Sequence, residues 1–320
     1  MTSEHTKVQA MISPLGGQQL LAQDVVRVRL PLSNAFLLGT PGQPWVLLDT
    51  GSPGNAGMIV RAAEARFGLG ARARPQAIVL THGHLDHIGS LWALQKRWEN
   101  MSIYVHPLEL PYLTGASPYP PPDPTVGGSM SALSPLLVPG PFDFRPQVHA
   151  LEELGDLPAL RGWTFVNTPG HSPGHISLWR ERDRLLIAGD AFVTTVQESL
   201  VAALSLRPRK AHGPPAYYTP DWDAARTSVR RLAALQPALA ITGHGDPLEG
   251  ASLLDELAGL ATNFDSQARP AHGRYVAQPA VTGSTGVLRL PPKPAFRLSL
   301  RPVLMVSAIL LLLALRRRGI

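Results

Sequence analysis

Short apolar runs, separated by turns rich in glycine, proline and polar residues, organise most of the chain. Apolar stretches of four to six residues predict strands at 25–30, 34–38, 45–48, 77–80, 163–167, 176–180, 185–188 and 238–241. Apolar residues at helical spacing predict helices over 57–67, 88–98, 221–235 and 253–264. Strands that alternate with helices predict an α/β fold, and 320 residues can bury a full-sized core.

Residues 107–147 interrupt this pattern with eleven prolines, three of them consecutive at 120–122. Each proline removes a backbone donor and fixes φ, and apolar residues in the segment recur at no regular spacing. We therefore expect no packed helix or strand here. The segment is predicted to form a surface loop or a lid inserted into the domain.

Histidines and aspartates lie where the predicted strands end and glycine-containing turns begin. The strand at 77–80 runs into Thr81-His82-Gly83-His84-Leu85-Asp86-His87, and other strands end beside Asp49, His171, Asp190 and His244. Side chains at the ends of strands in a layered α/β protein converge on one edge of the fold. The sequence therefore predicts one site assembled from distant segments.

These residue types favour a metal centre. The chain has no cysteine, which excludes a thiolate zinc site and a cysteine nucleophile. Zinc binds imidazole and carboxylate, and two ions need about six or seven ligands. His82 and His84 can face one ion across Gly83, and Asp86 and His87 begin a helix that points to a second. Iron and manganese accept the same ligand types as zinc.

The ordered motifs resemble those of a known family. Leu-Leu-Asp49-Thr-Gly, Thr-His82-Gly-His84-Leu-Asp86-His87, Thr-Pro-Gly-His171-Ser-Pro-Gly-His175, Ala-Gly-Asp190 and Thr-Gly-His244-Gly are similar to the five motifs of the metallo-β-lactamase superfamily, over about residues 20–260. The resemblance implies an αβ/βα four-layer sandwich. It places His82, His84 and His171 on one metal, Asp86, His87 and His244 on the other, and Asp190 between both. Asp49 is implied as a support for a ligand.

Some residues of this chain differ from the motifs of particular branches of the superfamily, and these differences disfavour those branches. Asp190 at the bridging position resembles glyoxalase II and the acyl-homoserine lactonases, whereas true metallo-β-lactamases lack it. The flavodiiron proteins have a glutamate where this chain has His84. Ribonuclease J needs a large inserted domain, for which the chain has no room. Persulfide dioxygenases, which use one iron on a similar scaffold, remain an alternative.

The reaction that we expect is hydrolysis of an ester, a thioester or a lactone of a small molecule. A hydroxide that bridges the two metals would attack the carbonyl carbon, because metal coordination lowers the pKa of water from 15.7 to about 7. Asp86 would orient this nucleophile or relay its proton. The alternatives are an iron-dependent persulfide dioxygenase-like enzyme, a phosphodiesterase, and a membrane-attached protein with a structural metal site.

Four further residues lie near the motifs. His175 is expected to support a ligand rather than to bind metal, because the coordination is already full without it. His212 is a candidate substrate contact, with a loop residue as the alternative. Tyr217 and Tyr218 lie between Asp190 and His244, where lactonases place a substrate-contacting tyrosine. Core packing would explain these two tyrosines equally well.

The net charge of +6 is concentrated in the C-terminal part of the chain. Nine basic residues and no acidic one follow Asp265, whereas residues 1–265 hold 20 basic and 23 acidic residues. A nucleic-acid enzyme concentrates basic residues around the site that binds phosphate, so no nucleic-acid partner is expected. We divide the chain into a metallo-β-lactamase-type domain at 1–265, a basic, proline-containing tail at 266–302 and an apolar segment at 303–315.

The apolar segment 303–315 is a candidate membrane anchor. As a helix it would reach about 20 Å, short of the about 30 Å of a hydrocarbon core. A helix in the membrane interface, a buried helix and an oligomer contact are the alternatives. Residues 1–20 contain no continuous apolar region typical of a secretory signal, so we expect a cytoplasmic protein, with membrane attachment through 303–315 as a variant of it.

Overall fold

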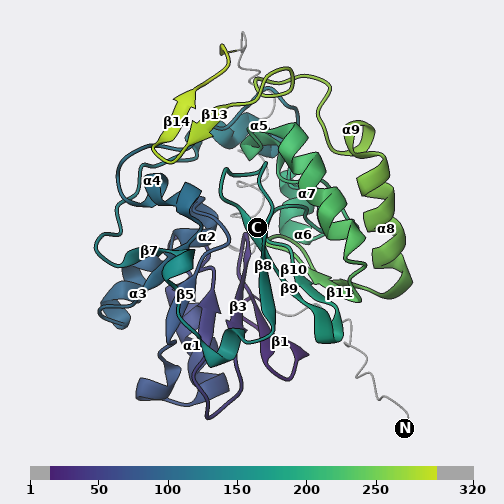
Figure 1. Ribbon diagram of the computed structural model, residues 1–320. Helices are drawn as coiled ribbons and strands as arrows, with labels where there is room; N and C mark the ends of the chain where they lie inside the picture. The colour runs from purple at the N-terminus through teal and green to yellow at the C-terminus, as the bar shows by residue number, and fades with distance from the viewer. Residues whose placement is uncertain (1–14, 294–320) are drawn as a thin grey trace, which may run out of the picture.

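The computed structural model describes residues 15–293, and two β-sheets stand face to face at its centre (Figure 1). The first sheet has seven strands in sequence order: β1 (Gln18–Ala22), β2 (Val25–Arg29), β3 (Asn34–Leu38), β4 (Val46–Leu48), β5 (Ala77–Val79), β6 (Ile103–Val105) and β7 (Val148–Ala150). Strands β1 to β4 pair antiparallel, and β4 to β7 pair parallel.

The second sheet has five strands in the order β12-β11-β10-β9-β8. Their bounds are β8 (Trp163–Asn167), β9 (Ile176–Arg180), β10 (Leu185–Ile187), β11 (Leu239–Ile241) and β12 (Leu248–Glu249). Only β10 and β11 pair parallel, which directs the C-terminal ends of both strands to the same edge of the sheet.

Each sheet packs one face on the other sheet and one face on helices. Fully buried Phe36, Val79, Leu178 and Ile187 belong to the core between the sheets. The outer face of the first sheet packs on α1 (Ala56–Phe67) and α3 (Leu91–Arg97), and that of the second on α7 (Trp222–Ala234) and α8 (Gly250–Thr262). The layers run helix, sheet, sheet, helix, so the predicted αβ/βα four-layer sandwich is confirmed (Figure 1).

The predicted helix at 88–98 is wrong in its extent, because the chain forms two helices, α2 (Leu85–Ile88) and α3, separated by a break. The backbone carbonyl of His87 accepts hydrogen bonds from the amide and the hydroxyl of Thr50, at 2.7 and 2.8 Å. The carbonyl of Asp86 accepts one from Ser33 Oγ at 2.6 Å. These long-range bonds occupy carbonyls that would otherwise continue the helix.

The proline-rich segment contains packed elements, contrary to the sequence prediction. It forms α4 (Leu110–Leu113) and α5 (Ser129–Leu133), with 3₁₀ turns at Pro107–Glu109 and Ser134–Leu136. Prolines stand at the first positions of three of these elements, where a helix does not need the missing amide donor. Tyr112, Tyr119 and Phe144 are almost completely buried, and the two tyrosine rings stack 3.9 Å apart.

The described part of the expected tail is also folded. After α9 (Phe264–Gln267), the hairpin of β13 (Val281–Gly283) and β14 (Gly286–Arg289) lies against the proline-rich segment. Val287 N donates to Ser117 Oγ at 3.1 Å, and the buried Tyr275 donates its hydroxyl to the carbonyl of Pro121 at 2.7 Å. The packed part of the chain therefore continues beyond residue 265.

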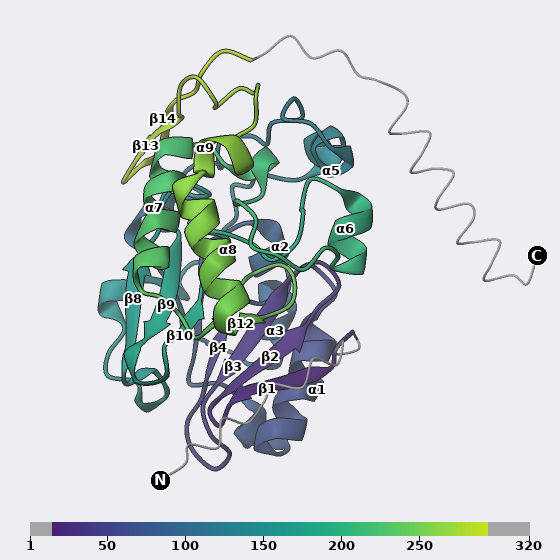
Figure 2. The same cartoon turned by 90° about the vertical axis from the view of Figure 1, so that its right-hand side faces the viewer.

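Helix α6 (Leu200–Ser205) and further 3₁₀ turns complete the fold. These turns are Gly70–Ala73, Leu151–Glu153, Pro158–Leu160, Glu181–Asp183 and Ala216–Tyr218. Figure 2 shows α5 and α6 on the same side of the molecule. Within residues 15–293, no helix is both long and apolar enough to cross a membrane. The segment 303–315 lies outside the described residues.

Candidate metal centre

Four polar turns meet at one edge of the two sheets. The turn after β5 carries His82, His84, Asp86 and His87, His171 lies between β8 and β9, Asp190 follows β10, and His244 follows β11. Backbone hydrogen bonds tie neighbouring turns, from Ile176 N to the carbonyl of Thr81 at 3.0 Å and from Gly243 N to that of Gly189 at 2.8 Å. The seven side chains named from the sequence therefore lie together, in three overlapping groups whose ligand atoms are within 4.8 Å of one another.

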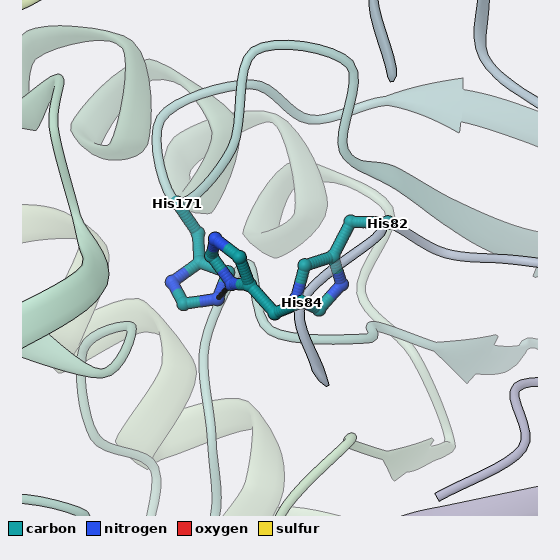
Figure 3. A group of neighbouring side chains, drawn as sticks. All are labelled: His82, His84 and His171. Carbon is teal, nitrogen blue, oxygen red and sulfur yellow. Dashed lines mark hydrogen bonds between the residues drawn. The ribbon is translucent and has the colours of Figure 1, made fainter. Parts of the chain in front are cut away.

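The first group consists of His82, His84 and His171, all buried (Figure 3). The three rings point toward one another, and His84 Nδ1 lies 3.0 Å from His171 Nε2. Nitrogens bound tetrahedrally to zinc at about 2.0–2.1 Å would stand about 3.3 Å apart, so a small outward movement of these rings would admit an ion.

The second group consists of Asp86, His87 and His244. His244 Nε2 lies 3.3 Å from a carboxylate oxygen of Asp86. Asp190 stands between the two groups: its Oδ2 is 2.9 Å from His244 Nε2, 3.5 Å from His87 Nε2 and 3.4 Å from His171 Nε2. One carboxylate thus contacts histidines of both groups.

Two of the ring nitrogens that face away from the centre have partners in the protein. Thr81 Oγ1 lies 3.1 Å from Nδ1 of His82, and the backbone carbonyl of Leu32 lies 2.6 Å from Nδ1 of His244. Such contacts fix the ring and leave Nε2 for a metal. Nε2 of His82 and of His87 and Oδ1 of Asp190 are buried, and the described residues give them no hydrogen-bond partner. The residues present therefore fit divalent cations, because a bound ion would satisfy these atoms.

Asp49 supports His87 directly and the turn that carries His82 through Thr81. Its Oδ2 accepts hydrogen bonds from His87 Nδ1 at 2.9 Å and from Thr81 Oγ1 at 2.7 Å, and its Oδ1 accepts one from Thr81 N at 2.8 Å. Asp49 is fully buried and has a φ of 58°, which few residues other than glycine adopt. The hydrogen bonds to His87 and Thr81 therefore hold Asp49 in an uncommon backbone conformation.

The charges inside the cluster match a cation. Burial lowers the pKa of His82 and His171 well below the ordinary value and that of His84 to about 4, so these rings are neutral and can bind metal. Burial alone would raise the pKa of Asp190, but the neighbouring His244 and His87 hold it well below its ordinary value. The first group therefore offers three neutral imidazoles beside the ionised carboxylate of Asp190.

His175 lies behind Asp190 and has both ring nitrogens engaged. Its Nε2 accepts a hydrogen bond from the backbone amide of Asp190 at 2.8 Å, and its Nδ1 lies 2.8 Å from Thr168 Oγ1. Gly189 has a φ of 54°, and a Cβ there would come within 2.6 Å of His175 Nε2. Glycine is therefore required at this position, and His175 holds Asp190 in place without a nitrogen to spare for metal.

Glu109 is a further buried residue of the site, and the sequence analysis did not find it. Its Oε1 accepts hydrogen bonds from Ser172 Oγ at 2.7 Å and Gly174 N at 2.6 Å. Its Oε2 accepts one from Gly83 N at 3.2 Å and another from the hydroxyl of Tyr119. Burial raises the pKa of Glu109 although these hydrogen bonds oppose the shift. One carboxylate thus joins the turn after β5 to the turn between β8 and β9.

An open pocket lies beside the second group. Asp86, His244, Tyr217 and Tyr218 are among its lining residues, whereas His212 is not and lies 3.9 Å from the carboxylate of Glu198. The ring of Tyr218 stacks on His84, with 4.4 Å between ring centroids and 27° between planes. The two tyrosines named from the sequence therefore lie at the pocket, and His212 lies outside its lining.

Comparisons with known proteins agree with this geometry. The chain is 41% identical over 248 residues to "Probable metallo-hydrolase YflN" of Bacillus subtilis, a match that covers 77% of the chain and 92% of that protein. It is 29% identical over 224 residues to "Probable metallo-hydrolase YybB" of the same organism, covering 70% of the chain and 84% of that protein.

Solved structures show the same fold. A "Beta-lactamase domain protein from Burkholderia ambifaria" superposes with a TM-score of 0.54 at 22% identity, over 81% of the chain and 79% of that protein. The sequence model described as "Metallo-beta-lactamase superfamily" matches residues 28–244, which is more than half of the chain and runs from β2 to the last ligand turn. This chain therefore belongs to the metallo-β-lactamase superfamily.

Proposed function

We propose that the chain is a hydrolase with two divalent metal ions, most plainly zinc, and that it cleaves an ester, a thioester or a lactone of a small molecule. His82, His84 and His171 would hold one ion and Asp86, His87 and His244 the other, and Asp190 lies within reach of both groups. The observation that carries the proposal is the set of buried, unpartnered ligand atoms facing one centre. Imidazole and carboxylate are ligands that zinc takes, and the chain has no cysteine to compete with them.

The metal centre and the chain contribute different parts of the chemistry. When bound, two zinc ions supply a polarised carbonyl oxygen and a water whose pKa is lowered from 15.7 to about 7. Asp86 is the ligand-group carboxylate that reaches the pocket, with 29% of its side chain exposed. Burial would raise the pKa of Asp86, but His87 and His244 lower it. An ionised Asp86 can accept a proton from the attacking water and pass it to the leaving group.

Two features support a carbonyl substrate. Asp190 stands between the two groups, as the resemblance to glyoxalase II and the acyl-homoserine lactonases implies. Tyr218 stacks on His84 and lines the pocket, so that its ring can hold a planar ester or lactone beside the ligands. No Lys or Arg stands among the described residues that line this pocket, which disfavours a phosphodiester.

The variant Asp86→Asn tests the role of this carboxylate. Loss of a general base typically lowers kcat by about 10²- to 10⁴-fold, and we expect a loss in this range with the fold retained. The matched control is Asp143→Asn, because Asp143 is exposed and pairs with Arg145 away from the centre. Unchanged kcat in the Asp86 variant would overturn the mechanism. One iron per chain, with oxygen consumed in the presence of a persulfide, would instead support the oxygenase alternative.

A further inference from the structure

The pocket beside the metal centre is lined mainly by apolar side chains. Its cavity volume is about 200 Å³. Its apolar lining residues come from loops and from α2, α5 and α6: Leu32, Pro53, Leu85, Met130, Leu137, Leu200 and Ala203. The polar lining residues are Ser52, Gln197, the two tyrosines, Asp86 and His244. Most of the wall thus offers no hydrogen-bonding partner to a substrate.

We infer that the substrate carries an uncharged hydrocarbon group, alkyl or aryl, which occupies this pocket while its carbonyl lies at the metal centre. This inference rests on the proposed function, because it names the substrate class of the same site. Apolar surface removed from water by such a wall stabilises the complex in proportion to its area. A wall of apolar and aromatic side chains with a few polar groups is typical of sites for small molecules.

The charged residues that line the pocket also favour an uncharged substrate group. The lining residues of the described chain include the carboxylate of Asp86 and no Lys or Arg. A carboxylate or phosphate on the substrate that entered this pocket would lie against an apolar wall without a Lys or Arg partner, and an unpaired buried charge is costly. The pocket therefore selects against anionic acyl groups and anionic thioester carriers that would have to enter it.

Exposed apolar residues extend this surface toward solvent. Leu136 and Val138 flank the lining residue Leu137 in sequence and are 78% and 52% exposed. On α6, Val201 and Leu204 are 65% and 54% exposed and adjoin lining residues. Exposed apolar groups that gather at one place mark a binding surface more often than single ones do.

Hydrogen bonds join α5 to the residues at the start of α6, beside the pocket. Met130 N in α5 donates to the carbonyl of Glu198 at 2.9 Å, and Leu200 N at the start of α6 donates to Ser129 Oγ at 2.9 Å. The two helices lie on the same side of the molecule (Figure 2). The two helices that supply Met130, Leu200 and Ala203 to the pocket are therefore held to each other.

The test is a series of p-nitrophenyl esters from acetate to decanoate, with a p-nitrophenyl hemisuccinate as the anionic member. Burial of one methylene corresponds to about a fourfold gain in binding, so kcat/KM should rise by about this factor per added methylene until the pocket is full. The hemisuccinate should react at least tenfold more slowly than the neutral ester of equal length. A flat series, or a preference for the hemisuccinate, would overturn the inference.

A variant locates the effect in the pocket. Ala203→Phe places a ring among the lining residues and should lower the decanoate-to-acetate ratio of kcat/KM at least tenfold. Ala234→Phe, at the exposed C-terminal end of α7, is the matched control and should keep the ratio of the wild type. An unchanged ratio in the Ala203 variant would place the selectivity elsewhere.

A binding measurement separates this inference from the proposed function. Calorimetry of decanamide with the full-length protein does not depend on turnover. Binding that Ala203→Phe weakens, in a protein that hydrolyses no ester, would support the apolar pocket and contradict the hydrolase. Ester hydrolysis without chain-length preference, together with no decanamide binding, would support the hydrolase and contradict the pocket.

Discussion

Replacing Glu109 with glutamine should weaken one metal position and spare the other. Glu109 hydrogen-bonds to the turn between His82 and His84 and to the turn that carries His171, but its carboxylate contacts none of Asp86, His87 and His244. The exchange preserves the size of the side chain, so any effect comes from its hydrogen bonds and its charge rather than from packing. We expect metal affinity to fall at the site formed by His82, His84 and His171.

The magnitude follows from the four donors around the carboxylate. Each oxygen accepts from one hydroxyl and one backbone amide, Ser172 and Gly174 on one side and Tyr119 and Gly83 on the other. The hydroxyls can turn to accept from the new amide group, but one backbone N–H loses its acceptor in either orientation. A buried donor without a partner costs about 1–3 kcal/mol. If this cost falls on the ligand turns, metal affinity at the first position drops about 5- to 150-fold.

Competition against a fluorescent zinc chelator measures the two affinities, and urea unfolding of the same samples measures stability. Asp123→Asn is the matched control, because Asp123 is also fully buried and accepts hydrogen bonds from Thr125 and Arg274 rather than from the histidine turns. That variant should lose stability and keep both metal affinities. Equal weakening of both positions in Glu109→Gln, or weaker folding with unchanged metal binding, would refute the assignment.

Three further predictions concern the metal centre. In Asp49→Asn, His87 loses its ionised partner, so metal affinity at the second position should fall about 10- to 100-fold by chelator competition, and an unchanged affinity would contradict the role of Asp49. Burial opposes a charge on His244, yet Asp190 raises its pKa to about 10 in the metal-free protein. Protons therefore compete with metal below that pH, affinity should rise from pH 7 toward 10, and calorimetry in two buffers should show proton release. Removal of zinc by a chelator should lower the free energy of unfolding by about 4 kcal/mol relative to protein at a free zinc concentration a thousand times Kd, and equal unfolding curves would argue against a zinc site.

The sequence predicted the parts of this molecule that depend on neighbouring residues. Strands such as β3 and β9 can be recognised in the sequence as apolar runs. The helix α7 begins after Asp221, whose side chain accepts hydrogen bonds from the amides of Asp223 and Ala224. The ligand turns follow such strands directly. Since a strand end fixes the place of the turn after it, the cluster of ligands could be inferred before the structure was known.

Features that depend on distant contacts could not be read in this way. Ser33 and Thr50 donate hydrogen bonds to the carbonyls of Asp86 and His87, which would otherwise continue the helix predicted at 88–98. No pattern of neighbouring residues indicates these contacts. Strands β6 and β7 were not predicted from the sequence, and each is paired with a strand that is distant in the chain or separated from it by the proline-rich segment. In the proline-rich segment, Tyr112 and Tyr119 gain their stability by stacking on each other and packing into the core.

Glu109 illustrates the limit for the site. It lies outside every motif, and its partners at Gly83 and Ser172 are 26 and 63 positions away in sequence. One signal was available: Glu109 is the only charged residue between 107 and 122. A single carboxylate in an apolar segment must be paired when it is buried, and a hydrogen-bonding role could have been inferred from that alone.

The most direct test of the central claim is metal analysis of the protein purified without added metal, with ester hydrolysis measured on the same sample. A dizinc hydrolase should carry about two zinc ions per chain, with turnover that is lost on chelation and restored by zinc. A protein that binds no metal, or one that binds about one iron per chain and hydrolyses no ester, thioester or lactone, would contradict that claim.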